Sequence, residues 1–399
     1  MVRSSSCPSE IYLDACATTP PRQEVIRRIL EVQESVWGNP SSLHGTGLIA
    51  AELLERSRQM IASCLMASAT EVVLTSGATE SIHLGLLGMA RSMQCGRLVI
   101  SAVEHPAVLA AAQALKHEGW DVCCWPVDPL GRVKLEDLDL MLAPPTRLVS
   151  IIWGQSEVGT IQPIKSIGLA CRERGIVFHT DATQVLSQGL LCWADLPIDL
   201  LSASAHKFQG PKGIGLLLLR PELIEVLQPL QGGGGQEQGL RAGTESVALA
   251  AGMAMALEQL KLSRPGFADV EMADQEKVQR MRDALRINLQ TLPGLHFTGD
   301  PINRLPHHLS MLVGSGDDQP ISGRAVVREL SRLGVATSSG SACMAGQPKN
   351  SDVLQAMQIK PEWLQSGLRF SLGSWLEETQ VQQIPDLLQQ AMIAAASTD

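Results

Sequence analysis

Short apolar runs alternate with stretches of helical periodicity between residues 23 and 219. The apolar runs predict buried strands at residues 71–74, 97–101, 148–153, 175–179, 199–204 and 216–219. The periodic stretches predict helices at residues 23–36, 48–65, 82–93, 107–117 and 167–174. Strands that alternate with helices are typical of an α/β fold with a parallel, mostly doubly wound sheet. Ligands of such sheets bind beyond the carboxyl ends of the strands.

The pattern changes after residue 260. A helix at residues 247–260 is followed by Ser, Arg, Pro and Gly at 263–266, which indicates a boundary. Beyond it, the sequence predicts helices at residues 270–290, 325–333 and 378–395, and strands at 295–297 and 309–313. A chain of 399 residues is long enough for two or more cores.

Composition narrows the possible partners. The net charge is −9, which argues against nucleic acid or an anionic membrane surface as the main partner. The longest apolar stretch, residues 247–257, is far shorter than the roughly 20 residues that span a bilayer. No leader-like segment opens the chain, so we expect the cytoplasm. Nine cysteines without CxxC spacing indicate neither a disulfide framework nor a metal site.

Polar residues gather where the predicted strands end. These residues are Thr79, His105, Ser156, Glu157, Asp181, Gln184, His206 and Lys207. Each has an ordinary alternative when taken singly: Lys207 could be a surface lysine, and Asp181 or Thr79 a helix cap. Together they supply an amine, a carboxylate, an imidazole and an anion cradle. Pyridoxal phosphate needs this set, because it forms an imine, protonates at its ring nitrogen, stacks on a ring and carries a phosphate.

Several stretches identify a family. The chain resembles the cysteine desulfurases of the NifS/IscS type, a group of class V aminotransferases among the fold-type I pyridoxal phosphate enzymes. The matching stretches are residues 12–14 (YLD), 17–20 (ATTP), 38–40 (GNP), 75–81 (TSGATES), 104–105 (EH), 181–184 (DATQ), 206–207 (HK), 210–213 (GPKG), 241–244 (RAGT), 338–343 (SSGSAC) and 369–373 (RFSLG). They follow the family's order over residues 11–375.

The resemblance implies a fold and a domain organisation. The expected fold is that of a fold-type I pyridoxal phosphate-dependent transferase, with a mostly parallel, seven-stranded type of sheet in a large domain. A smaller α+β domain is expected to fold over the cofactor. The large domain would span residues 15–262, and the small domain would combine residues 1–14 with 263–399.

The resemblance also implies roles for single residues. Lys207 resembles the Schiff-base lysine, and His105 resembles the residue that stacks on the cofactor and moves a proton. Asp181 resembles the partner of the ring nitrogen, and Gln184 the donor to the ring hydroxyl, next to Ser156 at a position where the family commonly has Asn. The expected phosphate ligands are Ala78, Thr79, Ser204, His206 and Thr244, the last from the other subunit of a homodimer. Asn39 and Arg369 resemble the clamp on the substrate carboxylate, which suits an arginine fork.

Cys343 separates a desulfurase from an ordinary aminotransferase. It lies in residues 337–346, a run of small residues without periodicity that predicts a loop. In the family, the matching thiolate takes sulfur from L-cysteine as a persulfide and leaves L-alanine. The sulfur would pass to an acceptor or iron–sulfur scaffold protein, for iron–sulfur clusters or thio-modification.

Other functions remain open at this stage. One is a lyase that acts on cystine or selenocysteine, or an aminotransferase of the same fold. Another is a scaffold protein without catalysis, which Ser156 and His83 suggest because both depart from the family's residues.

Overall fold

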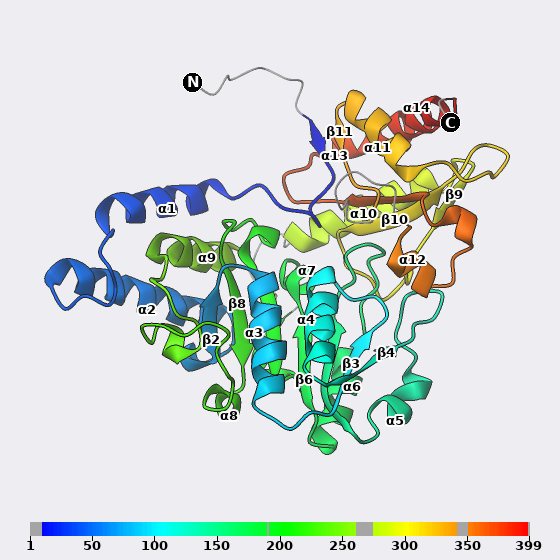
Figure 1. Ribbon diagram of the computed structural model, residues 1–399. Helices are drawn as coiled ribbons and strands as arrows, with labels where there is room; N and C mark the ends of the chain where they lie inside the picture. The colour runs from blue at the N-terminus through cyan, green and yellow to red at the C-terminus, as the bar shows by residue number, and fades with distance from the viewer. Residues whose placement is uncertain (1–9, 190, 261–273, 341–349, 398–399) are drawn as a thin grey trace.

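The computed structural model of the protein describes residues 10–189, 191–260, 274–340 and 350–397. Within these ranges the strands form a seven-stranded sheet, a three-stranded sheet and a two-stranded pair. Figure 1 shows the large sheet with its helices in the lower part of the molecule and the smaller sheets above it. Helices α1 (Gln23–Ser35) and α2 (Gly45–Leu65) extend to one side.

The large sheet confirms the predicted fold class. Its strands are β2 (Val72–Thr75), β3 (Arg97–Ser101), β4 (Asp121–Trp125), β5 (Thr146–Ile152), β6 (Val177–Asp181), β7 (Leu200–Ser204) and β8 (Gly215–Leu219). They lie in the order β2-β8-β7-β6-β5-β3-β4. Strand β8 runs antiparallel to both of its neighbours, and the others run parallel to one another.

Helices cover both faces of this sheet. Side chains alternate between the two faces of a strand, so neighbouring residues of β3 show what packs on each face. Leu98 and Ile100 of β3 pack in one hydrophobic cluster with α3 (Ala78–Arg91) and α4 (Pro106–His117). Val99, between them, packs in the cluster on the other face. That second face is covered by α6 (Ile164–Glu173) and by α9 (Val247–Gln259), which also contacts α1 and α2. Short helices complete this part: α5 (Leu138–Met141), α7 (Thr183–Leu186) and α8 (Pro221–Ile224).

A separate hydrophobic cluster belongs to the C-terminal part. Strands β12 (Gly367–Ser371), β10 (His308–Val313) and β9 (Leu295–Phe297) form an antiparallel sheet in that order. Helices α10 (Asp274–Leu289), α11 (Gly323–Arg332), α13 (Glu378–Gln382) and α14 (Ile384–Ala396) contribute to this cluster, whereas α12 (Asp352–Ala356) packs in a cluster of the large sheet. The C-terminal cluster also contains Ile11 and Leu13, because β1 (Ile11–Tyr12) pairs with β11 (Val335–Ala336). The proposed domain boundary at residue 262 falls outside the described residues and stays a prediction.

Several elements differ from the sequence-based expectation. Strands β11 and β12 and the short helices α5, α7, α8 and α12 were not predicted, and two further differences have a physical explanation. The expected helix over residues 378–395 is two helices, α13 and α14, and Pro385 in the first turn of α14 lacks the N–H group that would continue the helix from α13. Strand β4 was not expected, although residues 122–125 of its sequence, Asp-Val-Cys-Cys-Trp, are apolar; it is an edge strand, and its first four residues are partly or fully exposed. Among the described helices, none has both the length and the apolar character needed to cross a bilayer.

A buried ion pair ties α2 and β2 to the chain that follows the large sheet. Arg58 donates to both carboxylate oxygens of Glu237, at 2.6 and 2.7 Å, and the Leu74 N–H donates to the same carboxylate at 2.7 Å. The side chains of Arg58 and Glu237 are only 12% and 1% exposed. Removal of one partner would leave a buried charge without compensation.

We therefore expect Glu237→Ala to lower the free energy of unfolding by about 3–5 kcal/mol. The matched control is Glu118→Ala, which breaks the exposed ion pair between Glu118 and Arg91, the last residue of α3. This control should cost less than about 1 kcal/mol. Urea denaturation of both variants and the unmodified protein checks the prediction, and equal losses would contradict it.

Candidate active site

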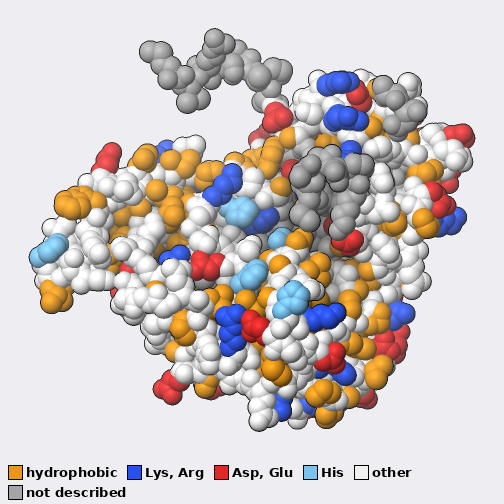
Figure 2. Space-filling model, in the orientation of Figure 1, with side chains coloured by type: hydrophobic (Ala, Val, Ile, Leu, Met, Phe, Trp, Pro, Cys, Tyr) orange, Lys and Arg blue, Asp and Glu red, His pale blue; other side chains and the backbone are white. Residues whose placement is uncertain are grey.

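A cavity of about 900 Å³ opens where the parallel strands of the large sheet end. Ten of the thirteen residues with a predicted role line it, and so does Glu157. The ten are Ala78, Thr79, His105, Ser156, Asp181, Gln184, Ser204, His206, Lys207 and Arg369. Figure 2 shows histidine, lysine, arginine and acidic side chains gathered around the hollowed middle of this face. The strand-end convergence expected from the sequence is therefore present in the structure.

Lys207 lies in the turn after β7, at the base of the cavity. Its ammonium donates to the backbone oxygens of Cys16 and Ala17 at 2.5 and 2.8 Å. Burial lowers the pKa of Lys207 below its ordinary value, while the charges of Asp181 and Asp14 oppose that shift. A lowered pKa increases the fraction of neutral amine, which is the form that bonds to an aldehyde carbon.

The end of β6 offers acceptors and donors that lack partners. Asp181 is buried, and its Oδ1 accepts from the Thr183 N–H at 3.0 Å. Gln184 donates through Nε2 to the Cys16 oxygen at 3.0 Å. Gln184 Oε1 and Thr183 Oγ1 are buried without a hydrogen-bond partner in the described structure. Because buried polar atoms rarely stay unpaired, these atoms indicate a polar ligand such as the cofactor ring.

The opposite side of the cavity suits a phosphate. Helix α3 begins there, and Gly77 at its N-cap position provides no side-chain cap. Gly77 also lies close to β8, since a Cβ atom on Gly215 would approach the Gly77 Cα to 2.6 Å. The first backbone N–H groups of α3, at Ala78 and Thr79, are therefore available to an anion. Lys212, whose charge the sequence analysis did not use, lines the same cavity.

Two histidines of the cavity are held neutral. Burial and the nearby lysines lower the pKa of His206 to about 4, and its Nδ1 lies 3.1 Å from Thr18 Oγ1. Burial lowers the pKa of His105 as well, and Lys207 adds to that effect while Asp181 opposes it. The Ala107 N–H donates to His105 Nδ1 at 3.1 Å, which leaves Nε2 for other partners. His105 is thus placed as a neutral base that lines the cavity.

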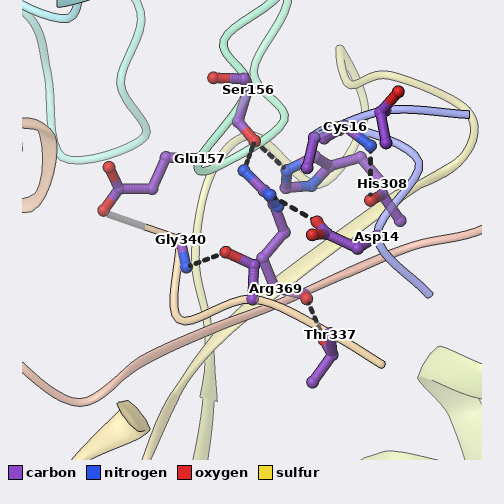
Figure 3. Close-up of polar contacts among 12 residues, drawn as sticks. Asp14, Cys16, Ser156, Glu157, His308, Thr337, Gly340 and Arg369 are labelled. Atoms are coloured by element: carbon purple, nitrogen blue, oxygen red, sulfur yellow. Dashed lines mark hydrogen bonds and ion pairs between the residues drawn. The ribbon is translucent and has the colours of Figure 1, made fainter. Parts of the chain in front are cut away.

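Arg369 of β12 is a buried cation at the cavity wall (Figure 3). It donates through Nη1 to the Ser156 oxygen at 3.0 Å and through Nη2 to Asp14 Oδ1 at 2.7 Å. Its Nε has no hydrogen-bond partner among the described residues. Desolvation lowers the pKa of Arg369, but its interactions with Cys16, Asp14 and Glu157 raise the pKa above the ordinary value. The guanidinium therefore stays charged and can attract a substrate carboxylate.

Two predicted site residues do not line this cavity, and a third lies outside the described residues. Asn39 is exposed, and its Oδ1 accepts from the Ser41 N–H at 2.9 Å. Thr244 is exposed and does not line the cavity of its own chain. Cys343 lies outside the described residues. The roles of these three residues stay predictions.

The sequence analysis missed Cys16 and Glu104 as site residues. Cys16 is a buried cavity residue whose Sγ lies 3.3 Å from His307 Nε2, and its backbone oxygen holds both Lys207 and Gln184. Glu104 accepts at one oxygen from Ser101 Oγ at 2.5 Å and from the Ile152 N–H at 2.7 Å. Both residues lie in or beside matched stretches, and that proximity was the only signal in the sequence.

Fold and site together define a pyridoxal phosphate-dependent enzyme. The residues fit the cofactor, because the amine, the carboxylate, the unpaired polar atoms and the uncapped helix start all line one cavity. The family model of aminotransferase class-V matches residues 11–384. The chain therefore belongs to the class V aminotransferase family.

Relatives and solved structures resemble the chain over most of its length. The cysteine desulfurase IscS of Dictyoglomus turgidum is 35% identical over 384 residues, which cover 95% of this chain and 94% of that protein. A solved NifS-like protein has a TM-score of 0.86 and 31% identity, with 97% of this chain and 100% of that chain covered. A structure of SspA in complex with cysteine has a TM-score of 0.77 and 31% identity, with 92% and 100% covered.

Glu104 gives the site a pH dependence that can be measured. Burial raises the pKa of its carboxyl to about 8, and the charge of Asp181 raises it further, because the hydrogen bonds from Ser101 and Ile152, which lower the pKa, do not outweigh desolvation. The folded state thus holds a proton that the unfolded state releases near the ordinary value of 4.5. The stability that this proton supplies is present below pH 4.5 and is lost as the pH rises through about 8.

We expect Glu104→Gln to remove this loss, because glutamine cannot ionise. Between about pH 5 and about pH 8, the unfolding temperature of the unmodified protein should fall by roughly 4 °C or more relative to the variant. Thermal unfolding at both pH values measures the difference, with the exposed Glu136→Gln as control. Parallel pH profiles for Glu104→Gln and the unmodified protein would contradict the prediction.

Proposed function

We propose that the protein is a cysteine desulfurase that converts L-cysteine to L-alanine and takes the sulfur as a persulfide on Cys343. The observation that carries this proposal is the meeting of Lys207 and Arg369 at one cavity, an amine for the cofactor and a buried cation for an amino-acid carboxylate. The likeness to the cysteine desulfurase IscS of Dictyoglomus turgidum and to the structure of SspA in complex with cysteine supports it.

The residues divide the work as follows. Bound pyridoxal phosphate supplies an electron sink that stabilises negative charge on the substrate. Lys207 anchors the cofactor, and Asp181 holds a proton on its ring nitrogen. Arg369 binds and orients the substrate carboxylate, because its charge is buried and partly unpaired. His105, neutral at physiological pH, accepts and returns a proton.

The sulfur transfer itself balances without an oxidant. The thiolate of Cys343 attacks the sulfur of L-cysteine, so that a sulfur–sulfur bond forms while the carbon–sulfur bond breaks. The electron pair of the broken bond stays with the substrate carbon, which takes a proton and becomes the methyl group of L-alanine. The persulfide then passes its outer sulfur to an acceptor or iron–sulfur scaffold protein, for cluster assembly or thio-modification.

A reducing compartment such as the cytoplasm suits this chemistry, since Cys343 must be a free thiol before it can accept sulfur as a persulfide. The seven cysteines in the described part of the chain form no disulfide.

We further propose that the protein acts as a homodimer. Large apolar side chains are exposed on and between α1 and α2: Leu30, Trp37, Leu43, Leu48 and Ile49. Leu43 is 90% exposed and Trp37 is 72% exposed, which is costly in water for a monomer. A partner subunit over this surface would also explain why Thr244 is exposed, since its expected phosphate lies in the other chain.

The desulfurase proposal predicts that Cys343→Ala loses turnover but keeps the cofactor. With L-cysteine and a thiol reductant, the unmodified protein should release equal amounts of alanine and sulfide. The variant should lose at least about 99% of both, because an essential nucleophile is missing, and it should keep the visible absorbance of bound cofactor. Cys124→Ala, at an exposed cysteine, is the control.

Turnover that survives in Cys343→Ala would replace this proposal with a lyase or an aminotransferase. Absence of cofactor absorbance in the unmodified protein, with no change in Lys207→Ala, would favour the non-catalytic scaffold.

The dimer proposal predicts that Leu43→Asp with Trp37→Asp weakens self-association. Two carboxylates in an apolar interface lose their hydration without a partner, so we expect the dissociation constant to rise at least about a hundredfold. Sedimentation velocity over a range of concentrations measures this. The exposed pair Leu140→Asp and Leu169→Asp, on α5 and α6, is the control, and an unchanged dimer in the first variant would contradict the proposal.

A further inference from the structure

Glu157 contacts two segments that are distant from it in the sequence. Its carboxylate accepts a hydrogen bond from Ser351 Oγ. Its Cγ lies against Gly340, where an added Cβ would approach it to 2.9 Å. Gly340 directly precedes residues 341–349 and Ser351 closely follows them, so one side chain contacts both borders of the stretch that contains Cys343.

Each border is also fixed by bonds of its own. The backbone N–H of Arg369 donates to the Ser338 oxygen at 2.7 Å, and the Gly340 N–H donates to Ser338 Oγ at 3.2 Å. Ser351 caps α12, because its Oγ accepts from the Leu354 N–H at 2.9 Å. Glu157 therefore contacts one border that is bonded to the strand of Arg369 and another that caps α12. Figure 3 shows Glu157, Gly340 and Arg369 in this arrangement.

Gly340 is suited to this contact in two ways. Its φ of 84° lies in the left-handed region, where a residue with a side chain is strained. The space that a side chain would need is filled by Glu157.

The charge of Glu157 acts on the same arginine. Burial raises the pKa of Glu157 to about 6, Arg369 and the bond from Ser351 lower it, and Asp352 raises it. The side chain is therefore mostly ionised at neutral pH. It shares Arg369 with Asp14, so it reduces the positive potential that a substrate carboxylate meets there.

Resting on the proposed desulfurase function, we propose that Glu157 is a positioning residue for sulfur transfer. The length of its side chain lets it hold Gly340 and Ser351, the two residues that border the stretch with Cys343, in one place. Its charge separately weakens the binding of the substrate carboxylate to Arg369. Substitutions at Glu157 can separate the effect of its side-chain length from the effect of its charge.

Two variants of the cofactor-loaded protein separate these effects. Glu157→Asp keeps the charge but is too short to reach Ser351, so the single-turnover rate of persulfide formation should fall about tenfold or more while KM stays within about twofold. Glu157→Gln keeps the reach but removes the charge, so KM at about pH 8 should fall about threefold to fivefold with little loss of that rate. Glu136→Gln serves as an exposed control.

The pH profile adds a readout that a merely structural role would not move. Below pH 6 the carboxyl of the unmodified protein is protonated, so its KM should converge with that of Glu157→Gln as the pH falls through about 6. A persulfide rate that is unchanged in Glu157→Asp would overturn the positioning role. A constant KM ratio from pH 5 to pH 8 would overturn the charge effect.

A measurement without substrate keeps this inference distinct from the proposed function. The rate at which iodoacetamide labels Cys343, followed by peptide mass spectrometry, should rise severalfold in Glu157→Asp because the borders are no longer held. Equal labelling of the two proteins would overturn the inference. Failure of the unmodified protein to desulfurate cysteine would instead overturn the proposed function, and the labelling result would still decide whether Glu157 positions the segment.

Discussion

Arg369, with its buried guanidinium, joins three distant parts of the chain. The guanidinium donates to Asp14, which follows β1, and to the backbone oxygen of Ser156, which follows β5. The backbone N–H of Arg369 donates to Ser338, which follows β11. A buried charge is tolerated only when it is paired and hydrogen-bonded. The large sheet and the three-stranded sheet must therefore keep their relative positions for Arg369 to keep its partners. The same requirement places the cation at the wall of the cavity, where its remaining Nε can serve an amino-acid carboxylate.

The electrostatics of the cavity follow from burial more than from net charge. Desolvation lowers the pKa values of Lys207, His105 and His206 and raises those of Glu104 and Glu157. Burial thus favours the neutral form of every one of these groups. A neutral amine and a neutral imidazole are the forms that can bond to a carbonyl carbon and accept a proton. The chain's overall charge of −9 therefore says little about the chemistry inside the cavity.

Much of this was predictable from the sequence, because both the sheet and its functional edge follow from alternation along the chain. The apolar runs located six strands of the large sheet, and ten predicted site residues line its cavity. The edge strand β4 and the break at Pro385 were not predicted, because half-exposed strands and prolines near helix starts leave the hydrophobic pattern ambiguous. The carboxylates Glu104 and Glu157 were visible as motif residues, but their contacts with Ile152, Gly340 and Ser351 depend on tertiary packing that no local pattern encodes.

The most direct test of the central claim is to locate the sulfur after one turnover. Cofactor-loaded protein is mixed with L-cysteine in the absence of reductant, and each of its nine cysteines is analysed by peptide mass spectrometry. The account predicts one additional sulfur atom on Cys343, with one alanine formed for each sulfur bound. Alanine formed with the added sulfur on Cys16 or another cysteine, or with none on the protein, would contradict it.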